Sequence, residues 1–412
     1  MSVPKIPPES TPRSPSAPHL SAVHEIYDLC VVGLEPHGIR LAARGLDAAM
    51  SVACNDTRLD SIERFNRADV GDDVALVDTI EDGLAAQNVR AFVETARARS
   101  FVISVLPVLR HDGVIDTAPV ENAIEAVVDV AESGSLIVLD APIPPGTTRG
   151  LLAEKLGAAG MHVGEDVFVA SAWVSNGQSF VGGLTPRCSE HAAELYGSLL
   201  GLPVETTTAE ACEVARLGHR AHQELNAAFA NELSTVSKHV GLDVGSVFSL
   251  VRSAGSASLA SPSPGPQNAT ARFEPRLFAA TCEHGTPLTR ATISQNELQP
   301  ARVAAEVRNA TQRFVAPTIA CLGLSCGPNG TLEHSPAMQV AMLIQRGQMG
   351  RLLVVDPRMS ASPIPGAELV GLTDALKRAD IVVVLNDDPS LAAAPRELYS
   401  RPSVIDTLGL LS

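Results

Sequence analysis

The stretch CVVGLEPHGIRLAA, residues 30–43, decides the fold. A short β-rich run meets a glycine-containing turn and continues as a helix, the order that begins a dinucleotide-binding unit. The turn of such a unit reads G-x-G-x-x-G, and the three positions here are Gly33, Glu35 and Gly38. The first glycine permits the tight bend and the third permits close helix packing, whereas the second lets the backbone approach a pyrophosphate. The turn therefore meets the needs of the fold.

Glu35 changes what the turn offers a cofactor. It brings bulk and negative charge to the place of two phosphates, and so opposes the attraction of the helix N-terminus. Asp56, after the second predicted strand, stands where an acid would bind the adenosine ribose of NAD, although a turn or N-cap aspartate fits the position equally well. Pro36 and His37 are interpreted as turn filler. These residues predict that NAD binding, if any, is weak or lost.

Length, charge and composition limit the classes of function. The chain has 412 residues, enough for two or three domains, and a net charge of −15 that argues against a nucleic-acid or anionic membrane surface. No apolar run approaches the roughly 20 residues that span a bilayer. Residues 1–26 are rich in Pro and Ser and predict a disordered tail without a secretory signal. Seven scattered cysteines without C-x-x-C spacing indicate reduced thiols in a cytoplasmic protein and no metal site.

The pattern along the chain divides into three parts. Residues 27–206 alternate Val/Ile-rich strands with helices, residues 207–313 are helical and begin with one long helix, and residues 314–412 alternate strands and helices again. Buried strands of this kind with intervening helices are typical of a parallel sheet covered on both faces. The prediction is an α/β protein in which two Rossmann-like, doubly wound parallel sheets are joined by a long central helix and a small helical domain.

Five local motifs resemble one enzyme family in the right order. They are PPGTTRGLL (144–152), ANELSTVSKHVGLDV (230–244), QNELQP (295–300), VVDP (354–357) and VVVLNDDP (382–389). Together they resemble the UDP-glucose/GDP-mannose dehydrogenase family of nucleotide-sugar 6-dehydrogenases, over nearly everything after residue 26. The resemblance implies the two-sheet fold above, dimerisation through the central helix, and two successive NAD⁺-dependent oxidations of a sugar alcohol through a cysteine thioester.

The positions that resemble the family's catalytic groups carry other residues. The alignment places Thr270 at the nucleophilic cysteine, Arg216 at the lysine, Arg220 at an asparagine, Trp173 at a glutamate and Pro142 at a threonine. A threonine hydroxyl is not appreciably ionised near neutral pH, and arginine does not exchange protons there. We therefore expect no cysteine-dependent four-electron oxidation.

The substrate side of the resemblance is altered in the same way. In the motif that supplies cations to the nucleotide sugar, Glu333 stands at a cationic position. Like charges about 4 Å apart repel by roughly 1–4 kcal/mol, so this residue opposes the two phosphates. Arg216, Arg220 and Glu333 are the candidate residues of a substrate cleft.

Three functions remain in competition. The favoured hypothesis is a non-catalytic member of the family that binds or assembles, as a homodimer through the central helix or as a heteromer with an active paralogue or a pathway enzyme. The second is an NAD(P)-dependent oxidoreductase that performs a single two-electron alcohol oxidation on a nucleotide-sugar or nucleoside-like substrate. The third is a small-molecule binding module that uses the cleft between the two α/β domains.

Overall fold

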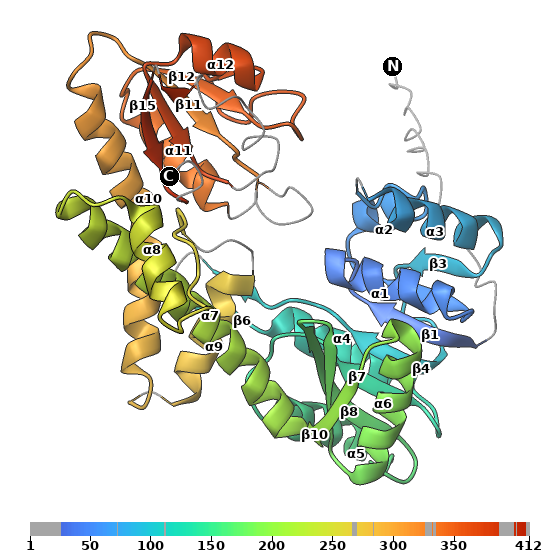
Figure 1. Ribbon diagram of the computed structural model, residues 1–412. Coiled ribbons are helices and arrows are strands. Elements are labelled where there is room, and N and C mark those ends of the chain that lie inside the picture. The colour runs from blue at the N-terminus through green and yellow to red at the C-terminus, as the bar shows by residue number, and fades with distance from the viewer. Residues whose placement is uncertain are drawn as a thin grey trace, which may run out of the picture.

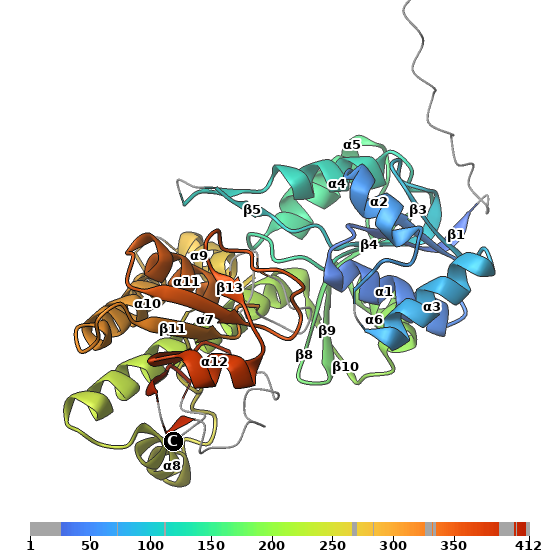
Figure 2. The same ribbon diagram turned by 90° about the horizontal axis from the view of Figure 1, so that it is seen from above.

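Two α/β units are joined by a long helix in this computed structural model (Figure 1). The structure describes residues 26–71, 73–110, 113–265, 270–282, 284–325, 332, 335–386, 399–400 and 402–408, and for residues 270–272 only the backbone. The blue-to-green unit carries the N-terminal sheet and the orange-to-red unit carries the C-terminal sheet, and the long central helix runs from the first unit toward the second (Figures 1 and 2).

The N-terminal sheet has eight strands in the order β10-β9-β8-β7-β4-β1-β2-β3. Its strands are β1 (Tyr27–Val32), β2 (Val52–Asn55), β3 (Val89–Phe92), β4 (Ala98–Ile103), β7 (Leu136–Leu139), β8 (Phe168–Ser175), β9 (Gln178–Gly183) and β10 (Val204–Thr208). Neighbours are parallel except β8 and β9, which form a hairpin. Asn176 and Gly177 have φ values of 51° and 73°, as the tight Asn-Gly turn of a hairpin requires.

Helices cover both faces of this sheet. One face packs on α1 (Pro36–Asp47), α2 (Leu59–Phe65), α3 (Val74–Ala85) and α6 (Pro186–Leu200), and the other on α4 (Ala118–Val128), the π-helical turn η1 (Thr148–Ala153) and α5 (Glu154–Ala158). Leu41 and Tyr196 are buried in the first core, and Ile124 and Leu152 in the second. A short antiparallel pair, β5 (Val108–Leu109) and β6 (Ile115–Asp116), extends from the unit.

The strand order reverses between β1 and β4. From β1 the chain builds outward through β2 and β3, then crosses to β4 on the other side and continues through β7 and β8. In open α/β sheets, ligands bind outside the carboxyl ends of the strands at such a switch point. The turn after β1, which contains Gly33, Glu35 and Gly38, lies at this edge.

The central region consists of α7 (Ala209–His239), α8 (Val244–Ser253), α9 (Thr270–Thr281) and α10 (Pro287–Thr311). The Thr208 side chain caps α7 by accepting from the backbone N–H of Ala211. The long helix packs on β8 and β9 of the N-terminal sheet and also on α9 and α10. It therefore brings residues of α7 and α9 to the edge of that sheet.

The C-terminal sheet has five parallel strands in the order β13-β12-β11-β14-β15. They are β11 (Thr318–Leu322), β12 (Arg351–Val355), β13 (Glu368–Leu369), β14 (Ile381–Val384) and β15 (Ser403–Asp406). One face packs on α10 and α11 (Pro336–Arg346), and the other on α12 (Leu372–Arg378).

The same turn is built once in each sheet. In the N-terminal unit, Asp56 follows β2 and accepts hydrogen bonds from the backbone N–H of Leu34, in the turn after β1, at 2.9 Å and from that of Arg58 at 2.8 Å. In the C-terminal unit, Asp356 follows β12 and accepts from the backbone N–H of Leu324, in the turn after β11, at 2.9 Å and from that of Arg358 at 3.0 Å. An aspartate at the end of the second strand thus holds the turn after the first strand in both units.

The predicted fold class is confirmed, with two parallel-dominated sheets joined through α7. The antiparallel β8–β9 hairpin is the departure from an all-parallel sheet. The division of the chain after residues 26, 206 and 313 stays a prediction. In the part of the chain that the structure describes, no helix is both long enough and apolar enough to span a bilayer.

Candidate active site

The glycines of the turn after β1 are required by its geometry. Gly33 has φ +107°, a conformation that L side chains rarely adopt. A Cβ on Gly38 would lie 2.0 Å from the carbonyl oxygen of Gly33. The first glycine therefore makes the bend, and the third lets α1 approach β1, as the sequence predicts.

Glu35 occupies the middle position without strain and with a partner. Its backbone is extended, with φ −72° and ψ 162°. Its carboxylate pairs with the guanidinium of Arg58 at 2.9 Å. No side chain caps α1, which begins with Pro36. The negative charge expected to oppose phosphates is thus paired to a cation, and the positive end of α1 is left uncapped by the chain.

Asp56 is occupied by the chain's own donors. Besides the backbone N–H groups of Leu34 and Arg58, it accepts from Arg58 Nε at 3.1 Å and from a terminal guanidinium nitrogen at 3.0 Å. Burial raises the pKa of Asp56, but these hydrogen bonds and the charge of Arg58 outweigh it and the pKa is lowered. These contacts are those of the turn aspartate that the sequence allows, and a role toward a ribose stays a prediction.

A buried carboxylate at the end of β7 organises the rest of the site. Asp140 is 1% exposed and accepts hydrogen bonds from three side chains. The donors are Tyr196 Oη at 2.7 Å, His37 Nε2 at 2.9 Å and Arg216 at 3.0 Å. Burial raises the pKa of Asp140, yet His37, Arg216 and Tyr196 together lower it to about 2. The carboxylate is therefore ionised.

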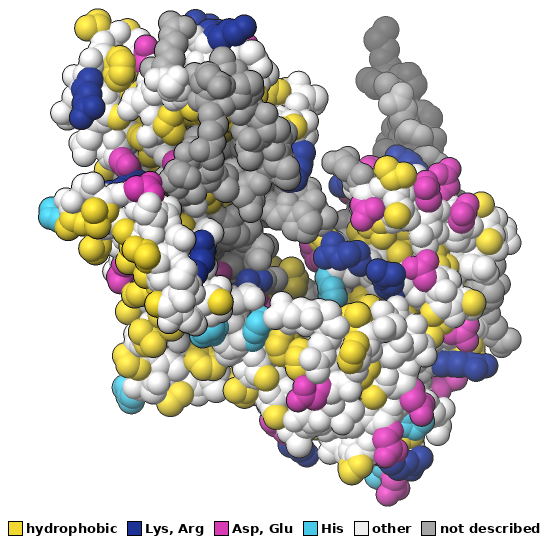
Figure 3. Space-filling view, in the orientation of Figure 1, with side chains coloured by type: hydrophobic (Ala, Val, Ile, Leu, Met, Phe, Trp, Pro, Cys, Tyr) yellow, Lys and Arg dark blue, Asp and Glu magenta, His cyan; other side chains and the backbone are white. Residues whose placement is uncertain are grey.

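The two arginines of α7 are both paired with carboxylates. Arg216 contacts Glu274 at 3.3 Å in addition to Asp140, and Arg220 contacts the other oxygen of Glu274 at 3.0 Å. The Glu274 side chain is 5% exposed, and those of Arg216 and Arg220 are 16% and 22% exposed. Two cations and two anions balance in this cluster, as buried charges require. Figure 3 shows Lys, Arg and His side chains gathered where the two lobes face one another.

Trp173 lies beside this cluster in β8. Its ring stacks on Phe180 at 4.5 Å and lies 5.3 Å from the His219 ring. The indole Nε1 is buried and has no hydrogen-bond partner among the described residues. The backbone carbonyl of the preceding residue, Ala172, accepts from Arg216. Trp173 is thus packed against α7 at the same edge of the sheet.

The remaining predicted positions divide by what the structure describes. Pro142 is buried in the turn after β7, two residues from Asp140. Thr270 is the first residue of α9, with only its backbone described. Glu333 lies outside the described residues. The structure therefore brings Arg216, Arg220 and Trp173 together, with Pro142 close by.

Sequence reasoning missed four of the residues that form the cluster. The interpretation of His37 as turn filler omits its contact with Asp140, and Asp140, Tyr196 and Glu274 were not singled out. Asp140 carried a signal, because an acid directly after the buried run LIVL stands at the carboxyl end of a strand, where ligands bind. Glu274 and Tyr196 lie in ordinary helical patterns and carried none.

A further carboxylate explains the PPGTT motif. Glu213 accepts from the backbone N–H groups of Gly146 and Thr148 and from the Thr148 hydroxyl. It lies one turn before Arg216 on α7 and is 2% exposed. The motif therefore fixes the turn after β7 on the long helix, which sets Asp140 opposite Arg216.

The thiol of Cys212, one turn before Arg216 on α7, is unsuited to nucleophilic attack. Cys212 is buried, with its sulfur 3.4 Å from the carbonyl oxygen of Ser171. Burial raises the pKa of Cys212 to about 12. A thiol, not a thiolate, is present at neutral pH, and only the thiolate is a strong nucleophile.

Comparisons with known proteins agree with the motifs. The chain is 29% identical over 409 residues to an NDP-N-acetyl-D-galactosaminuronic acid dehydrogenase of Ralstonia solanacearum, covering 94% of this chain and 96% of the relative. It is 28% identical over 416 residues to UDP-N-acetyl-D-mannosamine dehydrogenase of Escherichia coli, covering 93% and 98%. No protein-family model matches the chain.

Solved structures give the same fold. The UDP-D-ManNAc dehydrogenase from Pyrococcus horikoshii has a TM-score of 0.80 at 22% identity, with 93% of this chain and 96% of that one covered. The UDP-N-acetyl-mannosamine dehydrogenase from Staphylococcus aureus has a TM-score of 0.81 at 18% identity, with 92% and 94% covered.

These findings correct the favoured hypothesis of a non-catalytic protein. Relatives that match almost the whole chain are named as dehydrogenases, so the expectations of a pseudoenzyme and of a chain without enzymatic activity are contradicted. The second hypothesis, an oxidoreductase, agrees better with them. The relatives and structural neighbours of the chain are nucleotide-sugar dehydrogenases of the UDP-glucose/GDP-mannose dehydrogenase family, which confirms the resemblance carried by the motifs.

Proposed function

We propose that the protein is a nicotinamide-dependent oxidoreductase that oxidises one alcohol of a nucleotide sugar, or of a nucleoside-like compound, in a single two-electron step. The observation that carries the proposal is the buried charged cluster around Asp140, at the switch point between β1 and β4. Full-length similarity to named nucleotide-sugar dehydrogenases supports the reaction class.

The turn after β1 fits a dinucleotide. Gly33 and Gly38 give it the required shape, and α1 has no side-chain cap that would compete with a phosphate. Glu35 is drawn to Arg58, so its charge is compensated before any cofactor arrives. We infer that the pyrophosphate binds at the start of α1 beside this ion pair. A bound nicotinamide dinucleotide would supply the electron acceptor.

A single two-electron step follows from the chemistry of the thiols. A second oxidation through a thioester needs a thiolate. In the described part of the site the nearest sulfur, that of Cys212, is protonated and buried. We therefore expect a carbonyl product and one reduced coenzyme for each alcohol oxidised.

The test is a binding and turnover panel on the purified chain. NAD⁺ and NADP⁺ are titrated by thermal shift, and coenzyme reduction is followed with UDP-N-acetyl-D-mannosamine, UDP-glucose, GDP-mannose and uridine. The proposal expects saturable stabilisation by one dinucleotide and one reduced coenzyme per alcohol. A flat response to both dinucleotides up to millimolar concentration would overturn it, and two reduced coenzymes per alcohol would overturn the single step.

The Glu35–Arg58 pair provides a matched test of the cofactor turn. Arg58→Ala leaves the Glu35 carboxylate uncompensated and should weaken dinucleotide binding. Glu35→Gly removes both bulk and charge and should strengthen it. Each change should alter the dissociation constant by about five- to thirty-fold, since one charge interaction near a surface is worth about 1–2 kcal/mol. Equal affinities in all three proteins would show that the dinucleotide binds elsewhere.

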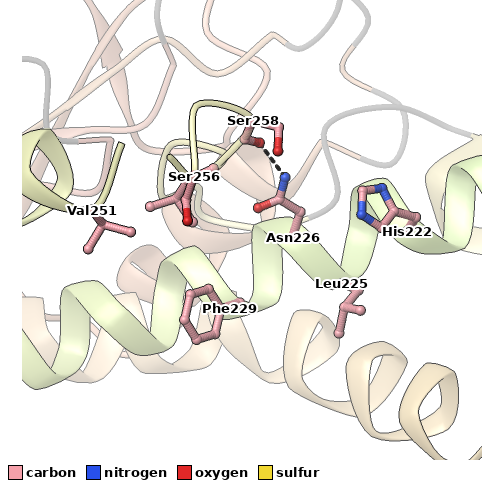
Figure 4. A pocket seen from close by; sticks show the side chains of 8 residues that line it. His222, Leu225, Asn226, Phe229, Val251, Ser256 and Ser258 are labelled. Atoms are coloured by element: carbon pink, nitrogen blue, oxygen red, sulfur yellow. Dashed lines mark hydrogen bonds between the residues drawn. The ribbon is translucent and has the colours of Figure 1, made fainter. Parts of the chain in front are cut away.

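The exposed face of α7 is the proposed homodimer contact. Phe229, Val236 and Val240 are each more than half exposed, and Leu250 of α8 is exposed as well. A shallow pocket between α7 and the segment after α8 adjoins it (Figure 4), lined by His222, Leu225, Asn226, Phe229, Val251, Ser256, Ser258 and Leu259. Apolar surfaces of this kind mark interfaces, and a stripe on one helix matches its own copy about a two-fold axis.

Light scattering after size exclusion tests this contact. The full chain should elute with the mass of two chains, and Val236→Asp should reduce it to one. Val74→Asp, an exposed valine on α3, is the control and should leave the dimer intact. A wild-type monomer at micromolar concentration would refute the contact.

A further inference from the structure

His37 and Asp140 meet across the switch point of the N-terminal sheet. His37 lies in the first turn of α1, which follows β1, and Asp140 directly follows β7. In the sheet, β4 lies between β1 and β7. His37 Nε2 is 2.9 Å from Asp140 Oδ2, and the side chains are 37% and 1% exposed. The carboxylate of this pair is thus buried in the protein, and the imidazole is partly exposed to solvent.

The state of Asp140 fixes the tautomer of His37. An ionised carboxylate has no proton to donate and only accepts hydrogen bonds. Nε2 must therefore carry a proton, which leaves the lone pair of the neutral imidazole on Nδ1. Among the described residues, Nδ1 has no hydrogen-bond partner. The basic nitrogen of His37 is available to a ligand.

The partners of Asp140 hold the pair in place. Tyr196 Oη donates to the same carboxylate oxygen as His37, and Arg216 donates to the other. Arg216 is in turn held by Glu274. With both oxygens occupied from fixed helices, the imidazole has one orientation in which its Nε2–H is satisfied.

We propose that His37 is the proton acceptor of the alcohol oxidation and that Asp140 is its positioning residue; this deepens the proposed function and rests on it. As the alcohol C–H bond breaks, hydrogen and both bonding electrons pass to the oxidised nicotinamide dinucleotide. The O–H bond of the hydroxyl group on that same carbon also breaks. Its proton goes to His37 Nδ1, and its electron pair forms the second bond of the carbonyl group.

The positive charge that this step creates on His37 is stabilised by the carboxylate of Asp140. His37 becomes an imidazolium whose Nε2–H points at the ionised Asp140, so the positive charge forms beside a fixed negative one. Its partial exposure then lets it release the proton to water. This route uses neither a cysteine nor a lysine, which agrees with the buried, protonated thiol of Cys212 and with the arginines at positions 216 and 220.

The chain contains a control pair. His162 and Asp166 also form an imidazole–carboxylate contact, at 2.8 Å, but both side chains are exposed and the contact uses Nδ1. His162→Gln removes an imidazole bonded to an aspartate without touching the Asp140 cluster. Any effect special to His37→Gln therefore arises from its place at the switch point.

The tautomer is tested by nitrogen NMR of the full chain labelled with ¹⁵N-histidine. The His37 signals, identified by their loss in His37→Gln, should show a protonated Nε2 and an unprotonated Nδ1 at pH 8, and Asp140→Asn should weaken this preference. A proton on Nδ1 in the wild type, or an imidazolium that persists at pH 8, would overturn the assignment. This readout needs no substrate, so it stands apart from the reaction proposed above.

Turnover with NAD⁺ and UDP-N-acetyl-D-mannosamine provides the second test. His37→Gln should lower kcat by about 10²–10⁴-fold, while the dissociation constant of NAD⁺ stays within a factor of two or three. His162→Gln should match the wild type. A His37→Gln variant with kcat within threefold of the wild type would overturn the proposal. If no substrate of the panel reduces the coenzyme in the wild type, the proposed function fails, and the tautomer alone then decides the geometry of His37.

Discussion

Asp140 should stabilise the N-terminal unit through its charge, and Asp140→Asn tests this. Its pKa lies at about 2 instead of the ordinary 3.8. One pKa unit corresponds to about 1.4 kcal/mol, so the ionised carboxylate contributes about 2.5 kcal/mol to the free energy of unfolding at neutral pH. Because the folded pKa is the lower one, this contribution is complete above pH 4 and is lost as the pH falls toward 2.

The only tryptophan of the chain provides the assay. Trp173 is 8% exposed and stacked on Phe180, in the strand beside β7. Its fluorescence in a urea titration reports unfolding where Asp140 acts. At pH 7 the Asp140→Asn variant should lose about 2–3 kcal/mol, and at pH 3 the difference should shrink to about half. A loss below about 1 kcal/mol at pH 7, or a difference independent of pH, would refute the ionised, paired state of Asp140.

Asp166→Asn is the matched control for this measurement. Asp166 also contacts a histidine and its pKa is also lowered, by hydrogen bonds and the charge of His162, but it lies at the surface. Solvent screens such pairs. The variant should show the same urea midpoint as the wild type at pH 7. An equal loss in both variants would mean that burial of Asp140 adds nothing.

Three further changes have defined outcomes. Gly38→Ala should destabilise the N-terminal unit by about 1–3 kcal/mol or more in the same fluorescence assay, because its Cβ would lie 2.0 Å from the Gly33 carbonyl oxygen; Gly157→Ala, with open space around it, should not. Burial raises the pKa of Glu224 to about 7 from 4.5, so its ionisation destabilises the fold as the pH rises through that interval. Glu224→Gln should therefore stabilise the chain by about 3 kcal/mol at pH 8 and not at pH 4, measured by circular dichroism in urea. Glu213→Gln should weaken the hold on the turn after β7 and lower the thermal midpoint, whereas Glu210→Gln, the partly exposed glutamate one turn earlier, should not.

The sequence by itself determined the fold and much of its order. Strands such as LIVL and VVV and the long Pro-free helix follow from local hydrophobic patterns, since a buried strand and a helix each impose a period on the chain. The roles of Gly33 and Gly38 could also be predicted from the sequence, because the backbone of the turn admits no other residue at either position without strain. Motifs shared with the nucleotide-sugar dehydrogenases added the order of the two units.

Only the tertiary structure decided what the charged residues do. His37 and Asp140 are 103 positions apart, and Arg216 and Glu274 are 58 apart. Such pairs depend on which strands are neighbours and on which face α7 lies, and no local period encodes either. Glu35 shows the same limit, since its charge looked like an obstacle to phosphates until the fold placed Arg58 beside it. Local steric constraints could therefore be predicted from the sequence, whereas the partners of the charged residues are determined by the tertiary fold, which brings them together at the edge of the sheet.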